Sequence, residues 1–291
     1  MKGNESPSPP PGGADASGDR RERRDLPLGV FDSGLGGLTV VQAIRARCPS
    51  EDILYLGDTA RVPYGTRSPD TIIRYALGCA RMLTSRGVKA IVVACNTVSA
   101  VALEALRVEL DLPVLGVILP GARAGVSAAG GGPCGVLGTA GTIASGAYPR
   151  AVASLSTRTE TLGQAAPLLV SLAEEGWLTG EVPRLVARRY LEPLIRAGAR
   201  SIVLGCTHFP LLREVIEEEA AALAGRHLPI VDSASATADD VASFLSERGQ
   251  AAAREGRGTL ELFVTDVPKG FAEVAARFLG EPVDRVTQVD L

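Results

Sequence analysis

From Leu28 onward, short runs of apolar and β-branched residues alternate with longer stretches in which apolar residues recur every three or four positions. The short runs are typical of strands buried on both faces, and the longer stretches are typical of amphipathic helices. This alternation predicts an α/β fold in which parallel strands are covered by helices on both sides. The expected strands are 28–32, 52–57, 88–94, 113–118, 134–138, 200–205, 228–232 and 259–265.

Two of the helical stretches have continuous apolar faces. Ser68 precedes the first of them and is a favoured N-cap residue, and Pro69 follows in the first turn, where proline is tolerated. We expect both apolar faces to pack in the core. They consist of Ile72, Ile73, Ala76, Leu77, Ala80 and Leu83 in the first helix and of Val98, Val101, Ala102, Ala105 and Leu106 in the second.

Two pairs of similar segments indicate an internal duplication. GVFDSG at 29–34 is similar to GVLGTA at 135–140, and AIVVACNT at 90–97 is similar to SIVLGCTH at 201–208. The two pairs are separated by similar intervals, which predicts two related α/β halves that face each other. Each half then carries a cysteine just beyond the end of a strand, where open parallel sheets bind ligands.

Composition excludes several classes of protein. The chain has 291 residues, 46% of them hydrophobic, but no apolar run approaches the roughly 20 residues that a membrane-spanning helix needs. The net charge is −3 and the basic residues are dispersed, so we expect neither a nucleic-acid partner nor a membrane partner. Residues 1–25 are rich in proline and glycine and nearly free of apolar residues, which predicts a disordered tail without a secretory signal.

The cysteines and lysines bear on compartment and cofactor. The five cysteines include no CxxC pair and no Cys/His spacing typical of a closed zinc site, which favours a reduced, cytoplasmic protein without a metal. The chain has three lysines, and none lies in a segment suited to a Schiff base with pyridoxal phosphate. They are Lys2, Lys89 and Lys269.

Cys95 and Cys206 are the candidates for chemistry, because each follows a predicted strand and precedes a predicted helix. A thiol with a pKa of about 8.5 is mostly protonated at neutral pH, so each cysteine needs a titratable helper. Asp32 could be such a helper, although a residue of this type fits a turn or cap equally well. His208 and the acidic pair Glu174 and Glu175 are the other candidates. Cys48, Cys79 and Cys134 are interpreted as small buried hydrophobes, and His227 as a surface cap.

Several segments, in order, resemble the motif series of bacterial glutamate racemases. They are FDSGLGGLTV at 31–40, YLGDTARVPYGTRS at 55–68, VVACNT at 92–97, GTAGTIASGAY at 138–148, LGCTHFPLL at 204–212 and VDSASATA at 231–238. The resemblance covers the chain from residue 28 to the C-terminus. It implies interconversion of L- and D-glutamate without a cofactor, which supplies D-glutamate for peptidoglycan, in an enzyme that commonly forms a homodimer.

The resemblance also implies two Rossmann-like, pseudo-symmetric domains with the active site in the cleft between them. We expect the first domain to comprise 26–117 plus 229–291, and the second 118–228. Cys95 would take the proton from D-glutamate and Cys206 from L-glutamate. By motif, Asp32 would assist Cys95, Glu174 and His208 would assist Cys206, and the substrate would contact Asp32, Ser33, Tyr64, Gly65, Asn96, Thr97, Thr207 and His208.

Three residues depart from the family pattern without removing a proposed catalytic group. Val98 follows ACNT where alanine is expected, Ala166 replaces a cysteine, and Leu119 replaces an acidic residue that many members carry. Each change bears on the pocket wall, on helix packing or on regulation.

Three other functions remain open from the residues. A Cys/His hydrolase would explain one cysteine but not the matched second one, whereas racemisation needs an acid/base group on each face of Cα. An aspartate or hydantoin racemase is a nearer alternative, although the DSGLGG opening favours glutamate. A two-lobed binding protein without catalytic activity is the third.

Overall fold

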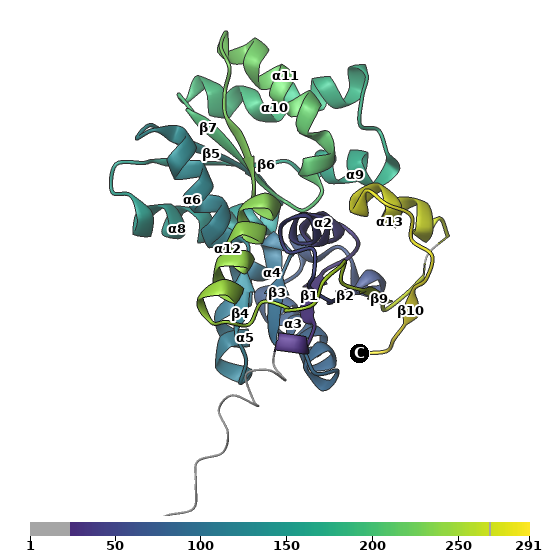
Figure 1. Ribbon diagram of the computed structural model, residues 1–291. Coiled ribbons are helices and arrows are strands. Elements are labelled where there is room, and N and C mark those ends of the chain that lie inside the picture. The colour runs from purple at the N-terminus through teal and green to yellow at the C-terminus, as the bar shows by residue number, and fades with distance from the viewer. Residues whose placement is uncertain (1–23, 268) are drawn as a thin grey trace, which may run out of the picture.

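The computed structural model describes residues 24–267 and 269–291, and it contains two parallel sheets (Figure 1). The predicted tail therefore lies outside the described residues, apart from residues 24 and 25. The larger sheet has six strands, which are, in spatial order, β10 (Thr287–Gln288), β9 (Leu260–Val264), β2 (Ile53–Gly57), β1 (Leu28–Asp32), β3 (Ala90–Val93) and β4 (Val114–Gly116). The smaller sheet has four, which are β6 (Thr161–Ala165), β5 (Cys134–Gly138), β7 (Ser201–Gly205) and β8 (Ile230–Asp232).

Helices cover both faces of each sheet. On the larger sheet, one face packs against α2 (Leu38–Arg47), α12 (Ser233–Glu247) and α13 (Phe271–Leu279), and the other against α3 (Pro69–Ser85), α4 (Asn96–Val101) and α5 (Leu103–Glu109). On the smaller sheet, one face packs against α9 (Pro167–Glu175), α10 (Glu181–Arg196) and α11 (Arg213–Ala224), and the other against α6 (Ile118–Ala129) and α8 (Ala147–Leu155). The shorter elements are α7 (Ala140–Ala144) and the 3₁₀ turns η1 (Thr59–Arg61), η2 (Tyr64–Thr66) and η3 (Phe209–Leu212).

The expected doubly covered α/β fold and its pseudo-symmetry are confirmed. The order β2-β1-β3-β4 in the larger sheet repeats as β6-β5-β7-β8 in the smaller one, and all pairs are parallel. The division of the chain into domains stays a prediction. Because β8 pairs with β7, however, residues 230–232 lie in the smaller sheet, whereas the sequence assigned them to the first domain.

Each of the eight expected strands is present within its expected range, and two strands were missed. β6 is an edge strand with the sequence TLGQA, and its side chains are only half-buried, so it lacks the apolar run that marks a central strand. β10 has only two residues, both exposed.

The two helical predictions also need correction. Ser68 occupies the N-cap of α3, but its hydroxyl donates to the hydroxyl of Thr71 at 3.0 Å instead of capping a backbone N–H. The second apolar stripe forms two helices, because Ala102 (φ −109°, ψ −8°) ends α4 and precedes α5 instead of continuing one helix. Val98, Ala102 and Leu106 are nonetheless fully buried, as the stripe predicts. None of the helices in the described part of the chain has the length and apolar character required to cross a membrane.

Candidate active site

Loops at the carboxyl ends of strands from both sheets surround a cavity of about 350 Å³. The first sheet contributes Ser33 after β1 and Cys95 after β3, and the second contributes Thr139 after β5 and Cys206 after β7. The cavity thus lies where parallel sheets bind ligands, between the two halves of the molecule. All the site residues expected from the sequence line it except Asp32.

Asp32 lies behind the wall of this cavity. It is the last residue of β1 and is 1% exposed, and its Oδ2 accepts a hydrogen bond from the backbone N–H of Gly34 at 3.0 Å. Its Oδ1 is buried without a hydrogen-bond partner among the described residues. Burial raises the pKa of Asp32, although the positive charge of His208 and nearby backbone N–H groups lower it in part. The expected direct substrate contact of Asp32 therefore does not follow from its position.

Cys95 is almost completely buried at the start of α4. Its Sγ lies 3.5 Å from Oγ of Ser33. Burial and the nearby Asp32 carboxylate raise the pKa of Cys95 to about 12, and the Ser33 hydroxyl opposes this effect only partly. Cys95 is therefore a protonated thiol at neutral pH, in a position to donate a proton to a ligand in the cavity.

Cys206 has a different neighbour, His208, which follows it in the loop before η3. The Sγ of Cys206 lies 3.7 Å from Nδ1 of His208, and Nε2 of the same ring lies 3.1 Å from Oε1 of Glu174. Burial lowers the pKa of His208, but its hydrogen bonds to Cys206 and Glu174 outweigh burial and raise the pKa to about 10. His208 is therefore a cation at neutral pH, within hydrogen-bonding distance of the Cys206 sulfur. The structure brings Glu174, not Glu175, to this ring.

Asn96 is held by residues from distant parts of the chain. Its Nδ2 donates to Oγ of Ser233 at 3.1 Å, and its Oδ1 accepts from the hydroxyl of Tyr148 at 2.9 Å. All three side chains are buried. The segments containing Tyr148 and Ser233 belong to the motif series, but nothing local in the sequence indicates that they orient Asn96.

Threonine hydroxyls form a second polar cluster on the cavity wall. Oγ1 of Thr97 lies 2.9 Å from Oγ1 of Thr139 and 3.2 Å from Oγ1 of Thr142. Because Thr97 follows β3 and Thr139 follows β5, this cluster joins the two halves of the molecule. Thr139 is a cavity residue that the sequence analysis did not identify.

Tyr64 lines the cavity, but its phenol is not free. Its hydroxyl donates to the carboxylate of Asp58, which is fully buried and also accepts hydrogen bonds from Arg61 and Thr265, each at 2.9 Å. Burial is the main reason why the pKa of Tyr64 lies well above its usual value. Asp58 therefore fixes the loop that carries Tyr64 and Gly65, a role that its place in LGDT did not reveal.

The loop after β1 also packs closely against the loop that carries Cys206. Oγ1 of Thr39 donates to the carbonyl of Thr207 at 2.9 Å. A Cβ atom at Gly36 would lie 2.4 Å from Oγ1 of Thr207 and 2.6 Å from Nδ1 of His208, so only glycine allows this approach. The glycine-rich loop thus serves close packing between the halves, which fits its lack of a full phosphate-loop spacing.

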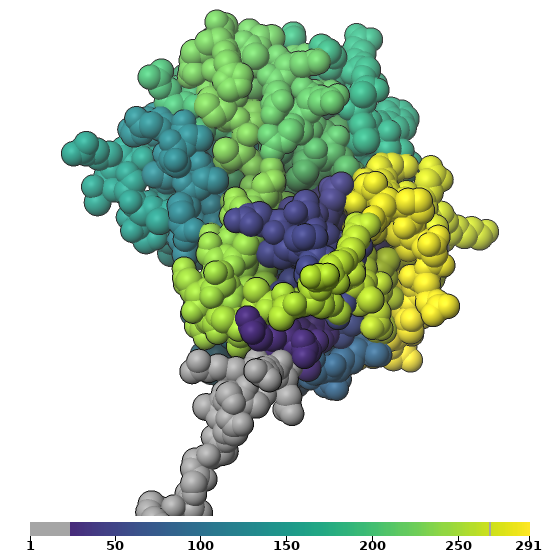
Figure 2. All heavy atoms as spheres, in the orientation of Figure 1, coloured from purple at the N-terminus to yellow at the C-terminus, as the bar shows by residue number. Residues whose placement is uncertain are grey.

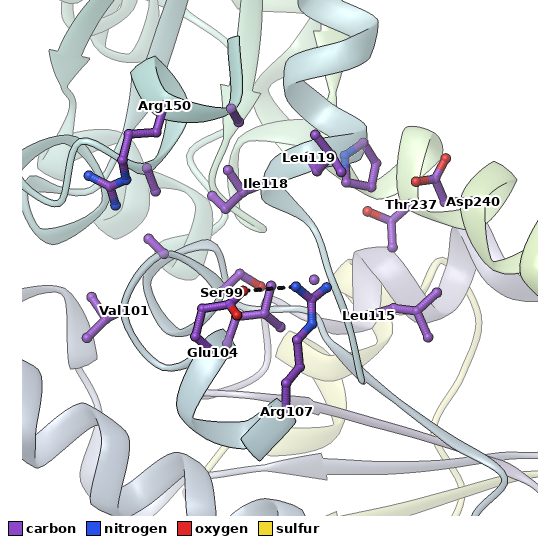
Figure 3. A pocket seen from close by; sticks show the side chains of 16 residues that line it. Ser99, Val101, Glu104, Arg107, Leu115, Ile118, Leu119, Arg150, Thr237 and Asp240 are labelled. Atoms are coloured by element: carbon purple, nitrogen blue, oxygen red, sulfur yellow. Dashed lines mark hydrogen bonds and ion pairs between the residues drawn. The ribbon is translucent and has the colours of Figure 1, made fainter. Parts of the chain in front are cut away.

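The three departures from the family pattern lie away from the cavity wall. Val98 and Ala166 are fully buried in separate cores, and neither lines the cavity. Leu119 is 45% exposed and lines a second cavity of about 390 Å³, which also includes Arg107 and Arg150 (Figure 3). Arg107 is paired there with Glu104 at 2.9 Å. The second cavity contains no cysteine or histidine and is separate from the candidate active site.

The titratable side chains that the structure describes form no cluster suited to a metal ion. Within the described ranges 24–267 and 269–291, no group of three or more His, Cys, Asp and Glu side chains is arranged to hold a metal ion. Lys89 is equally unavailable as a Schiff-base residue, because its buried amine forms an ion pair with Glu51 at 2.5 Å and donates to two backbone carbonyls.

Comparison with known proteins identifies the family. A family model for Asp/Glu/hydantoin racemases matches residues 38–241. The chain therefore belongs to the Asp/Glu/hydantoin racemase family. Among its relatives, the glutamate racemase of Geobacter metallireducens is 49% identical over 264 residues, which cover 91% of this chain and 96% of the relative.

Solved structures agree with this assignment. Glutamate racemase from Francisella tularensis, in complex with D-glutamate, has a TM-score of 0.84 and 34% identity, covering 92% of this chain and 98% of that one. Glutamate racemase from Thermus thermophilus, in complex with β-chloro-D-alanine, has a TM-score of 0.82 and 43% identity, with the same coverage. These three relatives are glutamate racemases.

Proposed function

We propose that this protein interconverts L-glutamate and D-glutamate without a cofactor, by proton transfer through two thiols. The observation that carries the proposal is that Cys95 and Cys206 follow equivalent strands of two related sheets and line one cavity. Racemisation requires an acid/base group on each face of Cα, and this arrangement supplies two. The glutamate racemases among the relatives support glutamate as the substrate.

The protonation states differ between the two sides of the cavity. The high pKa of Cys95, about 12, keeps this thiol protonated, whereas Cys206, whose thiolate is the proposed base, lies 3.7 Å from Nδ1 of the cationic His208. In this state Cys206 removes the Cα proton of L-glutamate and Cys95 donates its own proton to the opposite face. When D-glutamate leaves, Cys206 is the protonated thiol and Cys95 is the thiolate. The reverse reaction starts from that exchanged state, with Cys95 as the base.

Asp32, His208 and Glu174 support these proton transfers. The Glu174 carboxylate holds the imidazole of His208 through Nε2, so that Nδ1 faces the sulfur of Cys206. Asp32 acts on Cys95 from behind the cavity wall, because its carboxylate raises the pKa of that thiol. We therefore assign all three residues to proton transfer. Asp32 contributes to it without touching the substrate.

Hydroxyl and backbone groups are assigned to bind the two carboxylates of glutamate. Among the described residues that line the cavity there is neither a lysine nor an arginine, so apart from the cationic His208 the groups available to hold the carboxylates are neutral donors. Ser33, Thr97, Thr139 and Thr207 supply hydroxyls. Asn96, fixed by Tyr148 and Ser233, and the backbone near Gly65 complete the binding groups.

Deuterium exchange tests the proposal. Incubation of the protein with L-glutamate in heavy water, without added cofactor, should give D-glutamate that carries solvent deuterium at Cα, while recovered L-glutamate carries little early in the reaction. Alkylation of thiols should abolish the reaction, whereas chelators and carbonyl-trapping reagents should not. Absence of Cα exchange, or strong inhibition by a carbonyl trap, would overturn the proposal.

We further propose that the D-glutamate formed serves peptidoglycan synthesis in the cytoplasm and that the protein acts as a homodimer. The family resemblance supports both statements. Rescue of a bacterial strain that requires D-glutamate would support the first, and failure of an active protein to rescue it would contradict it. Light scattering of the purified protein measures its mass in solution and so tests the homodimer, which a monomeric mass would contradict.

A further inference from the structure

Helix α13 connects the first sheet to the part of the second half that holds His208. Its residues Phe271, Ala275 and Phe278 are buried in the core that also contains α2, so the helix belongs to the first sheet's covering layer. Its other side lies beside α9, which covers the second sheet (Figure 1). The space-filling view shows the same contact, with the C-terminal segment in yellow pressed against the green and teal upper part of the molecule (Figure 2).

Arg277 of α13 binds the C-terminal end of α9. Its guanidinium donates to the backbone carbonyl of Glu174 at 2.7 Å and to that of Ala173 at 3.4 Å. Carbonyls at a helix C-terminus have no helical partner, and a cation is favourable there. Gly176, with φ +76°, ends α9, and a Cβ atom at this position would lie 2.7 Å from Cζ of Arg277. The end of α9 is thus shaped to receive this guanidinium.

The next residue, Phe278, contacts the partner of Glu174. The rings of Phe278 and His208 meet edge to face, with centroids 5.0 Å apart and planes inclined by 78°. Phe278 is 1% exposed, whereas the side chain of Glu174 is 55% exposed. Burial therefore does not fix the Glu174 carboxylate. Two consecutive residues of α13 instead contact the backbone of Glu174 and the ring of His208.

We infer that Arg277, together with Phe278, is a positioning residue that sets the hydrogen bond between Glu174 and His208 from the other half of the molecule. The inference rests on the proposed function, in which His208 serves Cys206. The groups around Cys95, which are Ser33 and Asp32, lie in the first half, whereas the hydrogen bonds that Arg277 forms go to α9 and to Glu273. Arg277 therefore acts directly on the Cys206 side of the proton relay.

The charges around His208 determine the direction in which its pKa should change when Arg277 is removed. Glu174 and Cys206 raise the pKa of His208, Asp32 interacts with it through space, and Arg277 is the cation that α13 contributes nearby. If Arg277 acted only through its charge, its removal would raise the pKa of His208. If it acts by placing Glu174, its removal lowers that pKa, because the hydrogen bond weakens.

The experiment measures the pKa of His208 by NMR, which is practical because the chain has only two histidines. In Arg277→Met we expect the pKa to fall by about one unit, and in Arg277→Lys, which keeps a donor for the Glu174 carbonyl, to fall much less. Glu273→Gln is the matched control. Glu273 lies on the same helix, 3.5 Å from Arg277, and is 82% exposed, so its replacement should leave the pKa unchanged. An unchanged or raised pKa in Arg277→Met would overturn the inference.

Gly176→Ala provides a second variant that keeps the charge. The added methyl displaces the guanidinium from α9, so the pKa of His208 should fall here as well, and an unchanged pKa would contradict the positioning role. In turnover, Arg277→Met should lower kcat from L-glutamate more than kcat from D-glutamate, and equal losses would count against a role confined to Cys206. Since the titration needs no turnover, a wild-type protein without racemase activity would refute the proposed function alone.

Discussion

Replacement of Gly36 by alanine tests how closely the two halves must meet around His208. The added Cβ would lie 2.4 Å from Oγ1 of Thr207 and 2.6 Å from Cε1 and Nδ1 of His208. Carbon atoms in ordinary contact are about 3.5–4.0 Å apart. The loop that carries Cys206 would therefore have to retreat by about 1 Å.

Such a movement disturbs the groups assigned to proton transfer. It alters the 3.7 Å contact between Cys206 and His208 and the 3.1 Å contact between His208 and Glu174. A misplacement of about 1 Å typically lowers turnover by about 100-fold, which corresponds to about 2.7 kcal/mol of transition-state stabilisation. Overpacking should also reduce the free energy of unfolding by about 1–3 kcal/mol.

The assay compares kcat/KM in both directions and urea unfolding for Gly36→Ala and a matched control. Gly78→Ala is suitable, because Gly78 lies within α3 and an added Cβ has no neighbour within 4 Å. Alanine should stabilise this helix by about 1 kcal/mol and leave the kinetics unchanged. A kcat/KM for folded Gly36→Ala within about threefold of wild type would refute the reasoning, because a 1 Å shift should cost far more.

Three further variants test other parts of the structure. Cys206→Ala removes one half of the relay, so racemisation in both directions should fall at least about 100-fold, and retention of the wild-type rate would point to a single mobile base. Because hydrogen bonds to Cys206 and Glu174 together raise the pKa of His208 to about 10, Glu174→Gln should lower that pKa and shift the alkaline loss of kcat to lower pH; an unmoved pH profile would contradict this. Lys89→Met leaves the buried carboxylate of Glu51 unpaired and should cost about 3–5 kcal/mol in urea unfolding, with partial recovery in the double variant with Glu51→Gln. A loss below about 1 kcal/mol would exclude a strongly coupled pair.

The sequence alone determined the features that depend on short stretches of chain. Buried parallel strands require local apolar runs, so the central strands were predictable, and Cys95 and Cys206 could be placed at strand ends from the residues around them. The repeated segments also predicted two related α/β halves, whose common strand order the structure then showed. β6 was not predictable, because an edge strand needs no apolar run.

Tertiary structure decided which side chains meet across the cavity. Glu174 and Glu175 are neighbours in sequence but lie about 100° apart around a helix, so only the docking of α9 determines that Glu174 reaches His208. Asp32 is near Cys95 in the structure, yet its place behind the cavity wall depends on how the following loop folds over it. Arg277 reaches α9 from a segment about a hundred residues further along the chain. Contacts of this kind depend on the relative placement of whole elements, which local patterns of apolar and polar residues do not encode.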